Sequence, residues 1–169
     1  MAHWVTRLLK HRRLDEADAK RLLGDGALQR IEARVAASES RHSGEIRVCI
    51  EAGLPLSYIR REARVRERAV MMFGKLRVWD TEHNNGVLIY LMLAEHAIEI
   101  VADRGVARHV GANEWQRIAG TMSAAFKAGQ FEAGLNQAID AVDALLRRHF
   151  ALAPGETNPN KLPDAPYLR

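Results

Sequence analysis

Hydrophobic residues repeat along the central part of the chain in patterns that predict three β-strands. The run EIRVCIE, residues 45–51, places Ile46, Val48 and Ile50 at every second position, which is typical of a strand with one well-buried face. Residues 86–93, GVLIYLML, are apolar without alternation and predict a central strand covered on both faces. Residues 97–102, AIEIVA, predict a third strand, and the connection before it is short enough only for an antiparallel hairpin.

Apolar residues with the helical period predict helices on both sides of these strands. A short helix begins after Asp15, which can cap it, and extends through Leu23 before the GDG at 24–26. The other predicted helices are one capped by Asp25 that ends near residue 42, a long one capped by Ser57 that ends near Leu76, and two over 112–128 and 131–149 that Gly129 separates.

The order of these elements predicts an α/β fold. A helix joins the first two strands, so that pair can be parallel with a right-handed crossover. We therefore expect a three-layer α/β/α sandwich with a small mixed sheet, a parallel pair plus an antiparallel hairpin strand, flanked by helices. We divide the chain into a basic N-terminal leader with a short helix (1–24), the domain itself (25–150) and a Pro-rich tail (151–169). We expect the tail to be flexible, because it holds four of the five prolines.

Composition places the chain among globular proteins and adds little about its partners. The net charge is +4 and the sequence pI about 9.6, but acidic residues nearly balance basic ones, so the charge is weak evidence for nucleic-acid binding. The single cysteine, Cys49, lies in a predicted strand and is interpreted as a small buried hydrophobe. No apolar run is long enough for a membrane span, and the start has no secretory signal. We expect a cytoplasmic protein, peripheral to the inner face of the membrane if it meets a membrane at all.

Three polar loops fall at one end of the predicted sheet. Strands one and two begin there and strand three ends there, so the loops should meet in one polar rim, formed by His42, Ser43, Glu45, Asp80, Glu82, His83, Asn84, Asn85, Asp103 and Arg104. Carboxylate and amide oxygens on loops suit a hard cation such as Ca²⁺. The candidate metal ligands are Asp80, Glu82, Asn84, Asn85 and Asp103. The alternative is a hydrogen-bonded lid, because Asn-Asn-Gly is common in turns and Asp103 can pair with Arg104.

The same segments resemble the TPM domain family over about residues 28–149. The resemblance rests on the order and spacing of Gly44-Glu45, Asn85-Gly86-Val87-Leu88, Ile98-Glu99-Ile100 and the helix pair around 126–134. It implies the same α/β/α fold, and it implies calcium binding, acid phosphatase activity, or a role in the repair or assembly of membrane complexes. Many members are exported or anchored, so this chain resembles a short form without signal peptide or transmembrane segment. Many also carry a Gly-Tyr-Gly-Leu-Glu-like loop where this chain has residues 102–106, and Asp103 is the acid it offers there.

No sequence motif identifies an enzyme. The phosphate-binding glycine motifs are absent, Cys49 is followed six residues later by Pro55 rather than Arg, and the histidines lack metal-ligand spacing. His42 and His83 lie on the polar rim and are interpreted as solvated loop histidines rather than general bases. We therefore name no catalytic residue and predict a non-catalytic binding or assembly module, for which Ca²⁺ is the candidate cofactor and no cofactor is the alternative. The alternative is a metal-dependent acid phosphatase-like hydrolase.

Two basic segments bear on partners. Arg60, Arg64 and Arg68 share one side of the predicted long helix and are interpreted as a solvated face. The leader combines Trp4, Leu8 and Leu9 with basic residues, so it can pack on the domain or rest on an anionic membrane surface, and packing is the preferred interpretation. Aromatic and basic residues do not alternate as in single-strand nucleic-acid proteins. The expected partner is an unknown protein, and a membrane-associated protein would fit this expectation.

Overall fold

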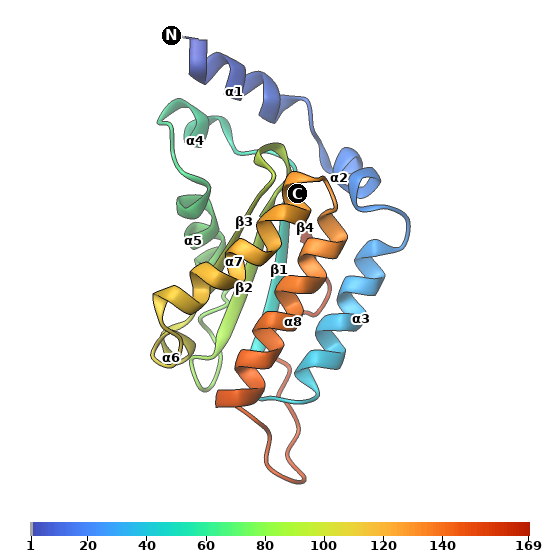
Figure 1. Ribbon diagram of the computed structural model, residues 1–169, viewed down its shortest axis with the longest axis vertical. Coiled ribbons are helices and arrows are strands. Elements are labelled where there is room, and N and C mark those ends of the chain that lie inside the picture. The colour runs from blue at the N-terminus through green and yellow to red at the C-terminus, as the bar shows by residue number, and fades with distance from the viewer. Residues whose placement is uncertain (1) are drawn as a thin grey trace.

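The computed structural model describes residues 2–169, with side chains from Trp4 onward. In chain order the elements are α1 (Ala2–Arg12), α2 (Glu16–Leu23), α3 (Ala27–Glu39), β1 (Glu45–Glu51), α4 (Leu56–Arg60), α5 (Val65–Lys75), β2 (Gly86–Met92), η1 (Leu93–Glu95), β3 (Ala97–Ala102), α6 (Arg104–Ala107), α7 (Ala112–Lys127), α8 (Phe131–His149) and β4 (Tyr167–Leu168). Figure 1 shows the helices on both sides of one sheet. The fold is α/β, as the sequence predicted.

The sheet is mixed and has the strand order β3-β2-β1-β4. β1 and β2 are parallel, with Glu45 opposite Gly86, and the residues stay in register to Glu51 opposite Met92. β3 returns antiparallel to β2, with Val87 opposite Ala102. The parallel pair and the hairpin strand confirm the predicted topology, and they leave β3 at an open edge.

Both faces of the sheet are covered by helices. Ile46, Val48 and Ile50 of β1 pack in the cluster that α2, α3, α7 and α8 form on one face. Cys49 packs with Met72 of α5 on the other face. β1 is therefore buried on both faces, and the expectation of one well-buried face is wrong, because α5 and the C-terminal segment cover the side that carries Arg47, Cys49 and Glu51.

The predicted helix from Ser57 to Leu76 is two helices. α4 ends at Arg60, and Glu62 follows with a left-handed φ of 52°, so the chain turns before α5 begins at Val65. The Glu67 carboxylate accepts a hydrogen bond from the Arg64 N–H and closes the new N-terminus. The prediction that Arg60, Arg64 and Arg68 form one solvated helix face is therefore wrong. Arg68 is only 3% exposed.

Arg68 joins a buried polar network between the sheet and α5. Its Nε donates to Glu51 Oε2 at 2.7 Å, and the Tyr90 hydroxyl donates to the same oxygen at 2.6 Å. Burial and the Glu51 carboxylate together raise the pKa of Tyr90. Removing one partner of such a buried pair typically costs about 3–5 kcal/mol, since the other charge is left uncompensated.

Two further details concern the helix caps. Asp15 caps α2 as predicted, and its side chain accepts from the Asp18 N–H at 2.8 Å. Asp25 does not cap α3. The cap position is Gly26, which adopts a left-handed φ of 71° that glycine tolerates and that moves the start of the helix one residue along.

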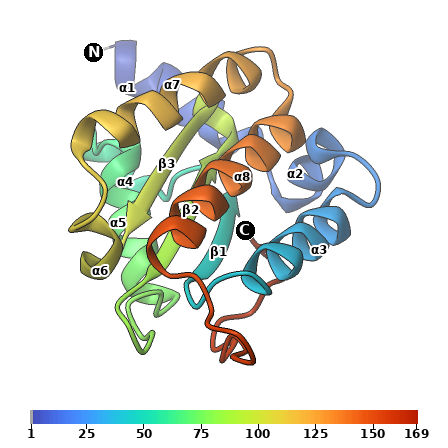
Figure 2. The same cartoon turned by 60° about the horizontal axis from the view of Figure 1, so that its bottom comes forward.

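The C-terminal segment lies on the domain. Tyr167 and Leu168 form β4, which pairs in parallel with Cys49 and Ile50 of β1. Glu45 accepts hydrogen bonds from the Lys161 and Leu162 N–H groups, and Arg47 donates to the Pro163 and Ala165 carbonyls. The segment that we expected to be a tail outside the domain thus supplies an edge of the sheet, and its C-terminus lies beside β1 (Figure 2). The sequence hid this strand because two residues between prolines show no periodicity.

Within residues 2–169, no helix has both the length and the apolar character that crossing a membrane requires.

Candidate functional site

The polar loops meet at one end of the sheet, as their positions in the sequence predicted. The Asp103 N–H donates to the Gly86 carbonyl and the Gly105 N–H to the Asn84 carbonyl, both at 2.9 Å. On the other side, the Glu45 N–H donates to the Asn85 carbonyl at 3.4 Å. The end of β3 and the starts of β1 and β2 therefore form one continuous polar rim.

Hydrogen bonds within the rim occupy most of its polar side chains. Arg104 donates to Asn84 Oδ1 from two nitrogens, at 3.1 and 2.9 Å, and Asn85 Nδ2 donates to the Ser43 hydroxyl at 3.2 Å. Asp80 pairs with Arg77 at 2.7 Å, and Glu82 lies 3.8 Å from the Lys161 ammonium. Much of the rim thus has the character of a hydrogen-bonded lid.

Asp103 differs from the other predicted ligands in having a buried oxygen without a hydrogen-bond partner in the described residues. Its Oδ1 accepts from the Arg104 N–H at 2.7 Å and caps α6. Its Oδ2 is buried and has no hydrogen-bond partner among the described residues. Such an orphaned oxygen is uncommon in a folded protein and calls for a ligand, a water or an ion.

Tight packing brings carbonyl oxygens to the same loop. A Cβ on Gly105 would lie 2.4 Å from the Asn84 carbonyl oxygen and 2.6 Å from that of His83, so only glycine fits there. Calcium takes six to eight oxygens, and carbonyls serve as well as carboxylates. However, no group of three His, Cys, Asp or Glu side chains in residues 4–169 is arranged to hold a metal ion. The rim therefore fits a cation only in part, with Asp103 supplying a buried acidic oxygen that has no hydrogen-bond partner in the described residues.

The two rim histidines have different surroundings. His83 is exposed, as expected. His42 is fully buried, so its interpretation as a solvated loop histidine is wrong. Its Nδ1 donates to the Gly44 carbonyl, its Nε2 lies 2.9 Å from the Ser38 hydroxyl, and burial lowers its pKa. Helices α3 and α8 close over it, and a side chain without access to solvent cannot act as a general base on a substrate.

Cys49 is equally inaccessible. The side chain is buried between the sheet and α5, and burial raises the pKa of its thiol. Because the thiolate is the nucleophilic form, this cysteine has the inert character of a structural residue, as the sequence indicated.

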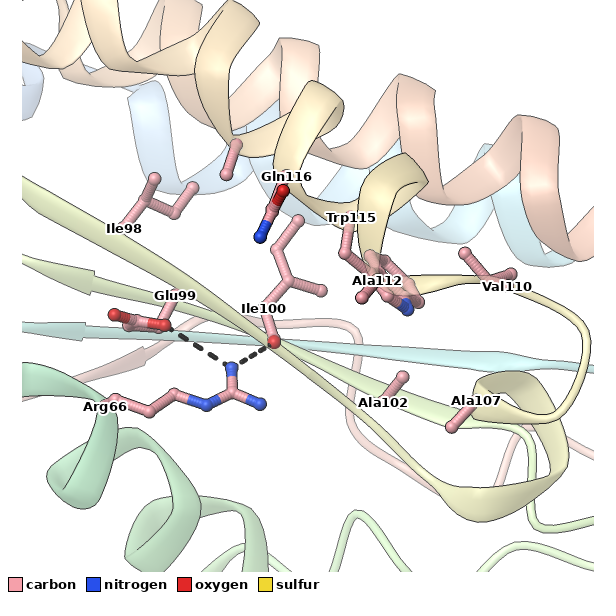
Figure 3. Close-up of a pocket in the computed structure, with 11 residues that line it drawn as sticks. Arg66, Ile98, Glu99, Ile100, Ala102, Ala107, Val110, Ala112, Trp115 and Gln116 are labelled. Carbon is pink, nitrogen blue, oxygen red and sulfur yellow. Dashed lines mark hydrogen bonds and ion pairs between the residues drawn. The ribbon is translucent and has the colours of Figure 1, made fainter.

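A groove along the open edge of the sheet was not predicted from the sequence. It has a volume of about 460 Å³ and runs between β3 and the start of α7 (Figure 3). Ile98 and Ile100 line it from the strand, and Trp115 and Gln116 line it from α7. Arg66 reaches the strand from α5, and its Nη1 donates to the Ile100 carbonyl at 2.5 Å. The alternation of Ile98 and Ile100 was visible in the sequence, but its position beside Trp115 depends on tertiary packing.

Comparison with known proteins identifies the family. The family model described as the TPM domain matches residues 17–145, which is most of the chain. The chain belongs to the TPM domain family. The predicted resemblance, drawn from residues 28–149, is thereby confirmed. No curated protein matches the chain in sequence.

Two solved structures share the fold of this TPM domain. The NMR structure of the BA42 protein from the psychrophilic bacterium Bizionia argentinensis has a TM-score of 0.73 and 26% identity, covering 85% of this chain and 93% of that one. The N-terminal domain of a P. gingivalis protein has a TM-score of 0.63 at 20% identity, covering 78% of this chain and 83% of that one. Residues 146–169, which include β4, lie outside the range that the TPM family model matches.

Proposed function

We propose that this TPM domain is a non-catalytic binding module that takes an extended segment of a partner protein along the open edge of β3. The observation that carries the proposal is the combination of an edge strand with a side-chain groove directly beside it. In strand addition, the main chain of the edge supplies affinity and the pockets beside it supply specificity.

The main chain of β3 has the required orientation. In an antiparallel pair, alternate residues turn their N–H and C=O groups toward the partner strand and away from it. The Ile100 carbonyl accepts from Arg66 rather than from β2, so Ile98, Ile100 and Ala102 direct their backbone groups outward. Within the described residues β3 has β2 as its only strand neighbour, so these outward groups are the template for an added strand.

The side chains around the edge suggest the chemistry of the partner. Ile98, Ile100 and Trp115 form an apolar wall for every second residue of an extended peptide. Arg66 pairs only weakly with Glu99, at 3.4 Å, and its side chain is 49% exposed. An acidic residue of the partner can therefore form an ion pair with Arg66 and draw it away from the Ile100 carbonyl (Figure 3). That carbonyl can then accept a hydrogen bond from an N–H of the added strand. We infer a partner segment that alternates apolar residues with polar ones and carries an acid.

Selection from a displayed random-peptide library on the folded chain tests this proposal. We expect enriched extended peptides with an acidic residue, and we expect their affinity to fall about tenfold or more in Ile100→Pro, which removes one outward N–H, and in Trp115→Ala. Val70→Ser, at an exposed position of α5, is the matched control and should bind normally. Peptides that bind Ile100→Pro as well as the parent chain would contradict the proposal.

The polar rim supports a second candidate, a calcium site of modest affinity. The supporting observation is the buried, unpartnered Oδ2 of Asp103, with Asn84, Asn85, Asp80 and Glu82 on the neighbouring loop. Binding would require Arg104 to leave Asn84, and Asp80 to leave Arg77, because both cations now hold the oxygens that calcium needs. The cost of these exchanges is the reason to expect weak binding.

Thermal unfolding of chelator-treated protein, with millimolar Ca²⁺ or Mg²⁺, tests the rim. A ligand at about a hundred times its dissociation constant adds roughly 2.7 kcal/mol, which raises the midpoint by several degrees. We expect a calcium-selective rise that Asp103→Asn abolishes and the control Glu156→Gln preserves. A midpoint unmoved by calcium would remove the cation site.

A metal-dependent phosphatase remains the alternative, and it would use the same rim. Phosphate ester hydrolysis needs a metal-bound water or another nucleophile together with cationic clamps. The rim offers Arg104 and the orphaned Asp103 oxygen for these roles. Hydrolysis of a phosphomonoester that depends on calcium and fails in Asp103→Asn would favour the enzyme over the binding module.

A further inference from the structure

The N-terminal helix docks on the domain through one of its sides. Arg7 Nε donates to Glu95 Oε1 at 2.8 Å, and Arg7 Nη2 donates to the Ala63 carbonyl at 2.8 Å. The Leu54 N–H donates to His11 Nδ1, so the proton of this imidazole is on Nε2, which donates to Glu95. Leu8 packs against the cluster under α5. The preferred sequence interpretation, that the leader packs on the domain, agrees with these contacts.

Docking turns the opposite side of α1 outward, and this side is both apolar and basic. We call it the α1 outer face, formed by Val5, Leu9, Lys10, Arg12 and Arg13, and Trp4 lies beside it, one turn before the docked Leu8. Leu9 is 54% exposed, Val5 40% and Trp4 39%. Leu56 of α4, which packs beside α1, adds another exposed side chain at 43%. Four of the seven large apolar side chains exposed in the described residues thus lie on these two helices.

The charge of this face has one sign. α1 contains no acidic residue, and its last turn carries Lys10, His11 and Arg12. Glu95, which faces the docked side of α1, is already paired with Arg7 and His11. Basic residues around an exposed apolar stripe are the pattern that binds an anionic lipid surface.

A pocket opens directly beside the exposed leucine. It has a volume of about 480 Å³, with Lys10, Arg13 and His96 among its lining residues and Leu9, Leu14 and Leu93 as its apolar part. A basic rim over an apolar floor suits a phosphate headgroup whose acyl chain follows. Helix α1 lies at the end of the molecule opposite the starts of β1 and β2 (Figure 1).

We propose that the α1 outer face docks on an anionic phospholipid surface, with headgroup phosphates at Lys10 and Arg13 and with Leu9 and Val5 in the lipid interface. The contact would need no membrane span. It goes beyond the proposed function, because it uses neither the β3 edge nor the polar rim, so either can fail without the other.

Cosedimentation of the full chain with vesicles tests the proposal. The probes are phosphatidylcholine vesicles with and without about one third phosphatidylglycerol. We expect binding to the anionic vesicles alone, weakened about tenfold or more by Leu9→Ser and by the double variant Lys10→Glu with Arg13→Glu. These side chains are exposed, so circular dichroism and the melting temperature should be unchanged.

Two matched controls separate this face from general charge and stickiness. Lys75→Glu with Lys127→Glu makes the same change in net charge elsewhere, and Val70→Ser removes an equally exposed apolar side chain; both should bind as the parent does. Absence of binding to anionic vesicles, or equal losses in the controls, would overturn the proposal. So would binding to soluble heparin that matches vesicle binding in strength and in its dependence on these variants, since the partner would then be a polyanion.

Discussion

Individual buried acids decide how the C-terminal segment is held. Glu39 is only 3% exposed, and its Oε1 accepts from the Ile46 N–H at 2.6 Å, at a position of β1 that β4 does not reach. Among the described residues, no donor forms a hydrogen bond with Glu39 Oε2. Burial raises the pKa of Glu39 to about 8, and the nearby Asp164 and Glu45 carboxylates add to the rise. A protonated Glu39 can instead donate to Asp164.

This raised pKa predicts a stability that falls as the pH rises. Unfolded Glu39 loses its proton near pH 4.5, whereas the folded protein keeps it to about pH 8, so the folded state binds more protons across this window. Glu39→Gln, whose amide accepts from Ile46 and donates toward Asp164, should abolish the fall. We expect the unfolding free energy of the variant to match that of the parent near pH 5. Near pH 8 it should exceed that of the parent by roughly a few kcal/mol.

Thermal melts of both proteins from pH 5 to 8.5 provide the measurement. The difference between the two curves isolates Glu39, because the opposite contribution of buried His42, whose pKa burial lowers, is common to both. Parallel curves would show that Glu39 ionises alike in the folded and unfolded states.

At the scale of elements, strands β1, β2 and β3 could be predicted from the sequence, whereas the edge strand β4 could not. β1, β2 and β3 each carry a hydrophobic run of strand length, and the short turn and long crossover between them determine their directions. The break between α4 and α5 could not be read from the sequence, because it contains neither glycine nor proline. Glu62 takes the left-handed conformation there instead. β4 depends on side chains more than a hundred residues away, namely Glu45 and Arg47, whose burial requires the backbone partners that the tail supplies.

This dependence predicts that the C-terminal segment stabilises the domain. Truncation after Ala153 would leave buried Glu45 and Arg47 without their partners, so we expect a loss of about 3 kcal/mol or more in unfolding free energy. Arg47→Met should reproduce part of the loss, whereas Lys161→Ala, which keeps the backbone donor, should have little effect. Urea unfolding measures all three. A truncated chain as stable as the parent would restore the flexible tail that the sequence suggested.

On the scale of the whole molecule, distinct surfaces lie at separate places on one scaffold. The polar rim lies where β1 and β2 begin, the groove follows the β3 edge, and the α1 outer face lies beyond the other end of the sheet (Figures 1 and 3). The net charge of +4 is unevenly spread, because α1 is wholly without acids. A binding module that rests on a membrane with α1 would leave both the groove and the rim open to partners.

The sequence by itself determined the strands, the main helices, the α/β class, the family and the meeting of the polar loops. Hydrophobic periods, connection lengths and strand directions are local or topological properties, so they can be read along the chain. Only the tertiary structure decided that His42 and Arg68 are buried and that β4 pairs with β1. It also decided that Asp103 Oδ2 is buried without a hydrogen-bond partner in the described residues, and that Arg66 and Trp115 line the same groove. These outcomes depend on which distant groups compete for each polar atom, and that competition is settled by packing in three dimensions.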